Sequence, residues 1–174
     1  LNENMIDFKD FIGFPDMSYG WSKLTCEYLA KLAYERKGLK SVCYRPFSGY
    51  GPTQDMSYPF PSIIKRALKI KRKERKFMVW GSGKQMRDFI HIDDCVRGVI
   101  KTMNKIDDGS AINLSTGKYT SFIDFAKITF NLLGHKRMEV VGSTNKPEGV
   151  FARGGCTKKQ RKLGFSPNTT LKNG

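Results

Sequence analysis

The chain has 174 residues, 39% of them hydrophobic and 12% aromatic, so it can bury at least one core and is not expected to be disordered. Lys and Arg outnumber Asp and Glu by 31 to 16, which favours an anionic ligand but does not choose among nucleic acid, a membrane surface and a phosphorylated metabolite. No apolar run approaches the roughly 20 residues of a membrane span, and the start of the chain lacks an export signal, so we expect a soluble, cytoplasmic protein without a membrane partner.

The first predicted element is a long helix, capped by Asp16 or Ser18 and ended by Gly38. Its apolar residues form two stripes at helical spacing, which predicts burial on two sides. A short β-rich segment, 39–44, comes after the helix and ends at Arg45-Pro46. The chain therefore opens with a helix, a turn and a strand.

The rest of the chain alternates in the same way. The further predicted strands are 77–80, 89–92, 111–115 and a short one within 136–142. Four further helices are predicted. One begins near Ser62 after a proline-rich loop, and another follows a cap at Asp93 or Asp94. The third spans 121–133 and the fourth lies around 157–162; the residues of the third that we expect to face inward are Phe122, Phe125, Ala126, Ile128 and Thr129. This alternation favours a layered α/β architecture.

Basic residues are densest between Lys65 and Lys76, where they alternate with Ala67, Leu68 and Ile70. This pattern is typical of the solvated face and exit of an amphipathic helix. No aromatic residues interleave the run as a stacking platform for single-stranded nucleic acid would require, so nucleic acid is not the expected partner.

Metal binding is not expected either. None of the four cysteines forms a C-x-x-C pair, and neither His91 nor His135 has a partner at a metal-ligand spacing. Free thiols in a reducing compartment are the better interpretation.

Tyr19 and Lys23 lie four residues apart at the start of the first predicted helix, so their side chains share one face, a turn apart. An ammonium beside a phenol near a helix N-terminus stabilises the phenolate and brings the phenol pKa toward the range that proton transfer needs. The same spacing also occurs in ordinary surface pairs, so assigning a catalytic role to this pair depends on motifs elsewhere in the chain.

Several such motifs lie downstream of the pair in a fixed order. They are Arg45-Pro46-Phe47-Ser48-Gly49-Tyr50-Gly51-Pro52, Val79-Trp80-Gly81-Ser82-Gly83, Arg87-Asp88-Phe89-Ile90-His91-Ile92-Asp93-Asp94, Pro147-Glu148-Gly149 with Arg153, and Leu163-Gly164-Phe165-Ser166-Pro167. From about residue 17 to residue 171, the series resembles the C-terminal half of the NAD(P)-dependent nucleotide-sugar epimerases and dehydratases, a family of extended short-chain dehydrogenases.

The resemblance implies a catalytic and cofactor site. Tyr19 would exchange a proton with a sugar hydroxyl while a hydride passes between the sugar carbon and nicotinamide. Lys23 would hold the nicotinamide ribose and lower the tyrosine pKa. Pro46 and Phe47 fall where the family lines the nicotinamide pocket. The cofactor implied is NAD or NADP.

The resemblance also implies a site for a nucleotide-diphosphate sugar. Arg87 and Arg153 match the two arginines that grip the diphosphate, a role suited to bidentate guanidinium contacts. Val79 and Trp80 match the strand that borders the base, and Ser48 stands where many members contact the substrate with asparagine. Three alternatives remain: an intramolecular partner for Arg87 such as Asp88 or Asp93, a free surface charge at Arg153, and a core position for Trp80. The segment around His91 is structural in the family, so we do not assign His91 a catalytic role.

The implied fold is the C-terminal part of an NAD(P)-binding Rossmann-type doubly wound sheet together with a small α/β substrate-binding lobe. Residues 1–52, with 88–117 returning to them, would form the Rossmann part, and residues 53–87 and 118–174 the lobe. Members of the class commonly dimerise through the helix that carries the tyrosine, so a homodimer is expected.

Besides Ser48, three departures from the family pattern limit what the chain can do. Cys156 occupies the usual aspartate position after the second arginine. No G-x-x-G-x-x-G follows a strand, so the cofactor pyrophosphate has no glycine-rich helix N-terminus. The family's catalytic serine or threonine would precede Leu1. We therefore expect half a site and an inactive isolated chain; the alternative is a nucleotide-sugar binding or regulatory module without chemistry.

Overall fold

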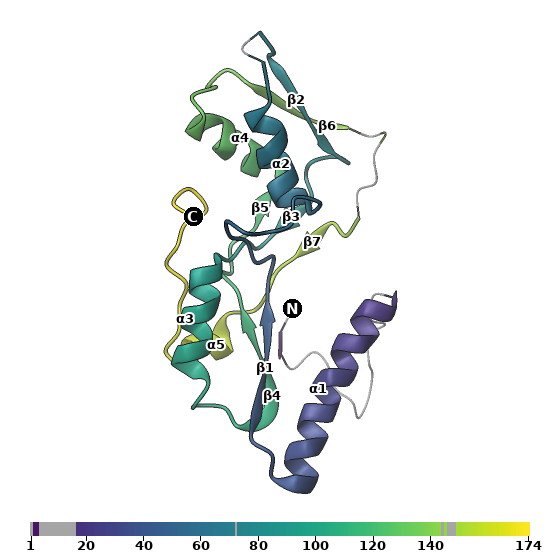
Figure 1. Cartoon of the computed structure of the whole chain (residues 1–174), viewed down its shortest axis with the longest axis vertical. Coiled ribbons are helices and arrows are strands. Elements are labelled where there is room, and N and C mark those ends of the chain that lie inside the picture. Colours follow the sequence, from purple (N-terminus) through teal and green to yellow (C-terminus); the bar gives the residue numbers. More distant parts are fainter. Residues whose placement is uncertain (1, 4–16, 72, 144, 146–148) are drawn as a thin grey trace.

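The computed structural model describes residues 2–3, 17–71, 73–143, 145 and 149–174. The elements fall into two groups along the long axis of an elongated molecule (Figure 1). The lower group comprises α1 (Met17–Lys37), β1 (Ser41–Pro46), α3 (Ile92–Thr102), β4 (Asp108–Leu114) and α5 (Lys158–Lys162). The upper group comprises α2 (Pro59–Leu68), β2 (Lys76–Trp80), α4 (Phe122–Leu132) and β6 (Glu139–Ser143). The short strands β3 (Met86–Arg87), β5 (Thr120–Ser121) and β7 (Ala152–Arg153) lie between them.

Parallel strand pairs dominate the sheets of the described residues. β1 pairs with β4 and β2 with β6, both in parallel, while β3 is parallel to β7 and antiparallel to β5. A parallel pair needs a long crossover, and helices lie in both crossovers: α3 between β1 and β4, and α4 between β2 and β6. The predicted α/β architecture is confirmed.

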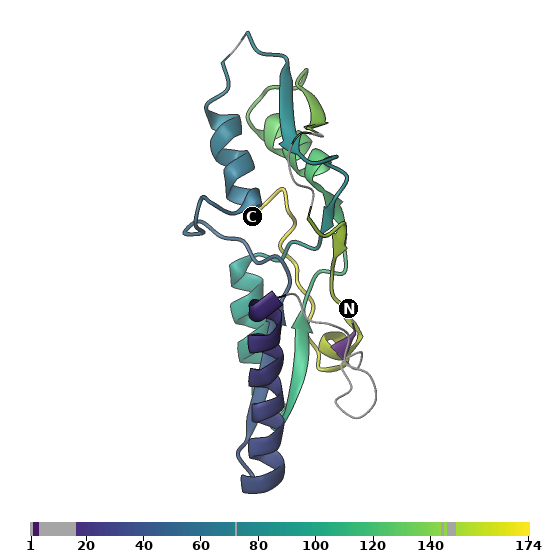
Figure 2. The same ribbon diagram turned by 90° about the vertical axis from the view of Figure 1, so that its right-hand side faces the viewer.

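The lower group is a β1–β4 pair packed between two helices, with α3 on one face and α1 on the other (Figures 1 and 2). Successive strand residues point to opposite faces. Tyr44 points toward α3, where its hydroxyl lies 3.3 Å from the Val99 carbonyl and 2.9 Å from the Thr102 hydroxyl. Arg45 points the other way and pairs with Glu27 of α1.

The upper group is held by an aromatic core between α2, α4 and the strand pair. Phe60 of α2 stacks on Phe125 of α4 with ring centroids 4.2 Å apart, and Phe77 of β2 meets Phe130 of α4 edge-on at 4.9 Å. Phe89, in the segment that returns to the lower group, packs against the same cluster. This core fixes the two helices and β2 relative to one another.

Most predicted helix ends are close to those observed. Gly38, with φ of +62°, ends α1 by donating its amide to the Tyr34 carbonyl at 2.8 Å. Ser121 caps α4, accepting from the Asp124 amide at 3.0 Å. The proposed cap Asp16 lies outside the described residues, whereas Ser18 lies inside α1.

Three expectations about the helices are wrong. The two apolar stripes of α1 are not buried on two sides: Leu24 is buried, but Trp21, Tyr28 and Leu29 are exposed in this chain. The second helix begins at Pro59 rather than near Ser62, because proline fits the first helical position. On α4, Ile128 is only half-buried, and the buried set includes Phe130.

The predicted strand at residues 89–92 is also wrong. Phe89 and Ile90 are buried as a connecting segment, and within the described residues strand pairing there is limited to a single bridge between Tyr50 and His91. Ile92 already begins α3, and its cap is His91, whose Nδ1 accepts from the Asp93 amide at 3.3 Å. Neither aspartate caps the helix. Among the described helices, none is both long and apolar enough to cross a membrane.

Candidate functional site

The predicted acid–base pair lies in the first turns of α1, toward the carboxyl end of β1. The helix leads into β1 through a short turn, so the two run in opposite directions and the first turns of α1 lie level with the last residues of the strand (Figure 1). Glu27 anchors the helix there, accepting from Arg45 Nε at 2.7 Å and from Nη2. Tyr19, Lys23 and Glu27 are spaced four apart and therefore share the helix face that meets β1.

Tyr19 and Lys23 are brought together as predicted. The Lys23 ammonium lies 5.4 Å from the centroid of the Tyr19 ring, a cation–π geometry. Tyr19 is 70% exposed, so its hydroxyl is open to a ligand. The Ser22 hydroxyl donates to the Tyr19 carbonyl at 2.8 Å, within the same turn.

The predicted nicotinamide-lining residues come directly after β1. Pro46 is exposed, whereas Phe47 is buried under Gly155, where an added Cβ would come within 2.7 Å of the ring. The Phe47 amide donates to the Leu114 carbonyl at 3.0 Å. Ser48 has a φ of +38°, a left-handed conformation that turns the chain sharply at this point. Pro46 is therefore open to a ligand, whereas Phe47 belongs to the buried packing beside Gly155.

The two predicted diphosphate-binding arginines are neighbours. Arg87 of β3 and Arg153 of β7 are register partners in a parallel pair, although far apart in sequence. Arg87 is half-buried and donates to the carbonyls of Met86 and Val150, both at 2.8 Å. Burial lowers the pKa of Arg87, and the positive charge of Arg153 lowers it further. Arg153 is exposed.

The two carboxylates considered as alternative partners of Arg87 are engaged elsewhere. Asp88 is fully buried and accepts from the hydroxyls of Ser115 and Thr116 and from the amides of Thr116 and Gly117. Asp93 lies beside His91, with 3.6 Å between its carboxylate and Nδ1. The Arg87 guanidinium itself donates to backbone carbonyls, so its positive charge remains available to an anion.

A pocket of about 290 Å³ adjoins Arg87, between α2, β2 and the start of α4. Its lining includes Ser62, Arg66, Trp80, Gln85, Arg87 and Phe122. Both predicted base-side residues line this pocket: Trp80 is 59% exposed, whereas Val79 is buried and also belongs to the core. The described lining holds two arginines and no carboxylate, and it does not include Tyr19 or Lys23.

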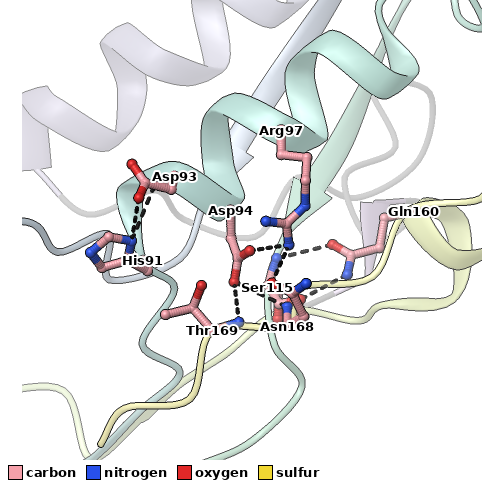
Figure 3. Close-up of polar contacts among 8 residues, drawn as sticks. All are labelled: His91, Asp93, Asp94, Arg97, Ser115, Gln160, Asn168 and Thr169. Atoms are coloured by element: carbon pink, nitrogen blue, oxygen red, sulfur yellow. Dashed lines mark hydrogen bonds and ion pairs between the residues drawn. The ribbon is translucent and has the colours of Figure 1, made fainter. Parts of the chain in front are cut away.

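The sequence did not single out several residues that build this region. Arg66 and Gln85 line the pocket, although Arg66 belongs to the run interpreted as solvated. Figure 3 shows two buried polar contacts of the lower group: Gln160 exchanges hydrogen bonds with the backbone of Ser115, and Asp94 accepts from Arg97 and from the amides of Asn168 and Thr169. Asp94 lies in the first turn of α3 and Gln160 in α5, and their backbone partners are distant in the sequence, so no local pattern predicts these contacts.

The cysteines match the expectation of free thiols. All four are unpaired; Cys26 is exposed and Cys95 buried. Cys156 is half-buried, and its carbonyl lies 3.4 Å from the Asn113 side-chain amide. The described residues contain no cluster that could hold a metal ion. Pro147 and Glu148 lie outside the described residues.

Comparison with known proteins gives consistent results. A family model described as GDP-mannose 4,6 dehydratase matches residues 10–174. GDP-mannose 3,5-epimerase 1 from Oryza sativa subsp. japonica is 30% identical over 164 residues, covering 92% of this chain and 42% of the relative. GDP-L-fucose synthase from Sinorhizobium fredii is 26% identical over 161 residues, covering 90% of this chain and 51% of the relative.

Solved structures agree in fold. UDP-glucose 4-epimerase from Thermotoga maritima, determined with UDP-glucose, superposes with a TM-score of 0.80 at 27% identity, covering 94% of this chain and 52% of that chain. The predicted Rossmann-type architecture is thereby confirmed. The chain spans about half the length of the relatives that it matches. On the family match, the chain belongs to the GDP-mannose 4,6 dehydratase family, within the NAD-dependent nucleotide-sugar epimerases and dehydratases.

Proposed function

We propose that the chain carries the substrate pocket and the acid–base pair of an NAD(P)-dependent nucleotide-sugar epimerase or dehydratase. The observation that carries this proposal is the adjacency of Arg87 and Arg153 on paired strands, beside a pocket whose described lining has no carboxylate. Two neighbouring guanidinium groups beside such a pocket are suited to the paired anionic oxygens of a diphosphate.

The electrostatics of the pair support an anionic ligand. Burial already disfavours the charged form of Arg87, and Arg153 adds repulsion. A diphosphate bound between the two guanidinium groups would relieve both costs. Trp80 would border the nucleotide base, and Ser48 would lie on the sugar side, at the carboxyl end of β1.

The acid–base step is assigned to Tyr19. As a phenolate, Tyr19 would accept the proton of a sugar hydroxyl while the C–H bond of the same carbon breaks and its hydride leaves, and the resulting phenol would return the proton when the transient keto group is reduced. The Lys23 ammonium, which lies against the Tyr19 ring, would stabilise negative charge on the phenolate. A bound nicotinamide supplies the hydride acceptor and donor of this chemistry.

The residues present fit only one end of the dinucleotide. Tyr19, Lys23 and Pro46 lie at the carboxyl end of β1, the edge at which parallel sheets bind ligands. Nothing in the sequence supplies the glycine-rich turn that seats a dinucleotide pyrophosphate. We propose that a further α/β unit supplies that seat and that the isolated chain does not turn over.

Exposed surface in the lower group supports docking of such a unit. Within the described residues, β1 pairs with β4 alone, which leaves its other edge open. Four apolar residues at helical spacing form a stripe along α3 and its C-cap, each between 45% and 65% exposed. They are Ile92, Val96, Ile100 and Met103. On the opposite face of the sheet, α1 exposes Trp21, Tyr28 and Leu29, the surface to which we assign homodimer formation.

Calorimetric titration of the chain with UDP and GDP tests the substrate assignment. We expect measurable binding that Arg87→Met weakens by at least about tenfold, since a charge-assisted bidentate contact is lost. Arg137→Met, which removes an exposed arginine from the same lobe, is the matched control and should change nothing. Equal affinities for Arg87→Met and the parent chain would refute the assignment.

An activity assay tests the catalytic assignment. NAD added with UDP-, GDP- and dTDP-sugars should give no steady conversion by the isolated chain, and robust turnover would refute the half-site proposal. In the complete protein, Tyr19→Phe should abolish conversion while leaving nucleotide binding intact. Nucleotide binding without any Tyr19-dependent conversion in the complete protein would favour a binding module instead.

A further inference from the structure

One end of the molecule gathers basic side chains from two turns that are far apart in the sequence. The turn from α2 into β2 lies at this end of the long axis (Figures 1 and 2). The turn from α4 into β6 meets it, because the Glu139 amide donates to the Arg75 carbonyl at 2.8 Å. The exposed basic residues of the two turns form a basic tip that comprises Lys69, Lys71, Lys73, Arg75, Lys76, Lys136 and Arg137.

The positive charge of the basic tip is largely uncompensated. The same turns contain two acidic residues, Glu74 and Glu139. Glu74 Oε1 accepts from the Lys71 amide at 3.0 Å, which holds this carboxylate within its own turn. Among the described residues, no lysine side chain of the tip forms an ion pair. A hollow of about 290 Å³ lies between the two turns, with room for a phosphate group, and its lining includes Arg75, His135, Lys136 and Arg137.

Exposed leucines lie beside the basic tip, at the ends of two helices that pack together. Ile64 and Leu68 are four residues apart on α2 and therefore share a helix face. Ile64 lines one cleft with Leu132 and Leu133 at the end of α4. Leu68 is 64% exposed, Leu132 57% and Leu133 37%, and Lys69 follows Leu68 directly. The tip therefore joins an apolar patch to a positive surface.

This combination favours an anionic membrane surface over nucleic acid as the partner. The phosphates of a nucleic acid would use the cations but not the leucines, and neither turn contains a Phe, Tyr or Trp on which a base could stack. At a membrane surface, apolar side chains enter between the lipid head groups while Lys and Arg attract anionic lipids. Peripheral binding of this kind needs no spanning helix.

We propose that the basic tip and its three leucines form a peripheral docking surface for anionic phospholipid membranes. Lipid phosphates would lie against the lysines and arginines, with one head group in the hollow between the turns, and the leucines would enter the interface. Such binding differs from the sequence-based expectation of no membrane partner, which considered only spanning segments and export signals. The arginine pair assigned to the diphosphate lies outside the tip, on β3 and β7, so membrane binding and nucleotide binding are separate properties of the chain.

Co-sedimentation with vesicles tests the charge of the tip. Vesicles of phosphatidylcholine alone are compared with vesicles in which about a third of the lipid is phosphatidylglycerol. The chain should sediment with the anionic vesicles only, and added salt should release it. Lys71→Gln combined with Lys73→Gln should weaken binding by at least about tenfold, since each charge near the surface contributes about fivefold. Lys158→Gln combined with Lys162→Gln removes the same charge from exposed positions on α5 and should change binding by less than about twofold. Equal losses in the two double variants, or equal binding to both kinds of vesicle, would overturn the proposal.

The leucines distinguish a membrane from other partners of the tip. Leu68→Ser combined with Leu132→Ser should weaken vesicle binding by about tenfold, because apolar surface no longer enters the interface. Leu39→Ser is the control, since Leu39 is 60% exposed in the turn between α1 and β1, at the opposite end of the molecule (Figure 1). Unchanged vesicle binding by the double leucine variant would overturn the membrane assignment. Tighter binding to random duplex DNA than to anionic vesicles at the same salt would overturn it in favour of nucleic acid. A parent dimer that the leucine variant converts to monomer, seen by sedimentation velocity, would overturn it in favour of a contact between two copies of the chain. The urea midpoint of each variant is measured, and Leu68→Ser alone decides the matter should the double variant not fold.

Discussion

Replacing Asp88 with asparagine tests how much the buried Asp88 carboxylate stabilises the contact between the segment after β3 and the end of β4. The carboxylate is 0% exposed and accepts from four donors. One oxygen faces the Thr116 amide at 2.9 Å and the other the Gly117 amide at 2.8 Å. Either orientation of an asparagine amide therefore places an NH₂ group against a backbone N–H that cannot rotate away.

The cost follows from this geometry. Hydrogen bonds to charged groups contribute about 1.5–3 kcal/mol each, and a buried donor left unsatisfied costs about 1–3 kcal/mol more. We expect Asp88→Asn to lower the free energy of unfolding by roughly 3–5 kcal/mol, a large part of the ~5–15 kcal/mol that stabilises a typical domain. With a urea m-value of about 2 kcal/mol/M, the midpoint should fall by about 2 M.

The assay is urea unfolding followed by circular dichroism and by the fluorescence of the two tryptophans. Asp107→Asn is the control, because the side chain of Asp107 pairs with exposed Lys40 at the surface and its loss should shift the free energy of unfolding by less than about 0.5 kcal/mol. An Asp88→Asn variant within about 1 kcal/mol of the parent chain would refute the reasoning, because a buried four-donor carboxylate could then be replaced almost freely.

Four further predictions concern three buried or constrained residues. The Tyr50 hydroxyl is buried without a hydrogen-bond partner among the described residues, so Tyr50→Phe should raise the free energy of unfolding by about 1 kcal/mol, and a loss of that size would contradict the assignment. Burial, and to a lesser extent the charge of Asp94, raises the pKa of Tyr50 to about 12 from its ordinary value of 10.0. Between these two values the folded state keeps a proton that the unfolded chain releases, so the free energy of unfolding should fall as pH rises from 10 to 12. The fall should be less steep in Tyr50→Phe. Burial, and to a lesser extent the charge of Asp94, raises the pKa of the Cys95 thiol to about 11. Iodoacetamide at pH 8 should therefore alkylate exposed Cys26 before Cys95, as peptide mass mapping would show. Equal alkylation rates for the two cysteines would contradict the burial of Cys95. Gly109 has a φ of +74°, and a Cβ added there would lie 2.7 Å from the Ala30 carbonyl oxygen. Gly109→Ala should therefore lower the free energy of unfolding by about 2 kcal/mol or more in the same urea assay. An unchanged urea midpoint would be inconsistent with this contact.

Local signals predicted the regular elements well. The end of α1 at Gly38 follows from the freedom of glycine at positive φ, and the start of α4 follows from Ser121, a good N-cap. The strand predicted at 89–92 failed because a short apolar run is equally compatible with a strand and with a buried connection. In this chain the run passes between two cores, and the described residues place no neighbouring strand along its length.

The candidate site depended more on long-range contacts. The proximity of Tyr19 and Lys23 is local and follows from helical spacing. The pairing of Arg87 with Arg153 requires β3 and β7 to meet, which no local pattern specifies. Arg66 was interpreted as part of a solvated run because its contact with Phe77 exists only once β2 packs beside α2.

The most direct test of the proposed site is a crystal structure of the chain with bound GDP. We expect the diphosphate between the guanidinium groups of Arg87 and Arg153, with the base against Trp80. A nucleotide bound elsewhere, for example on the exposed lysines between residues 69 and 76, with the pocket beside Arg87 empty, would contradict the central claim.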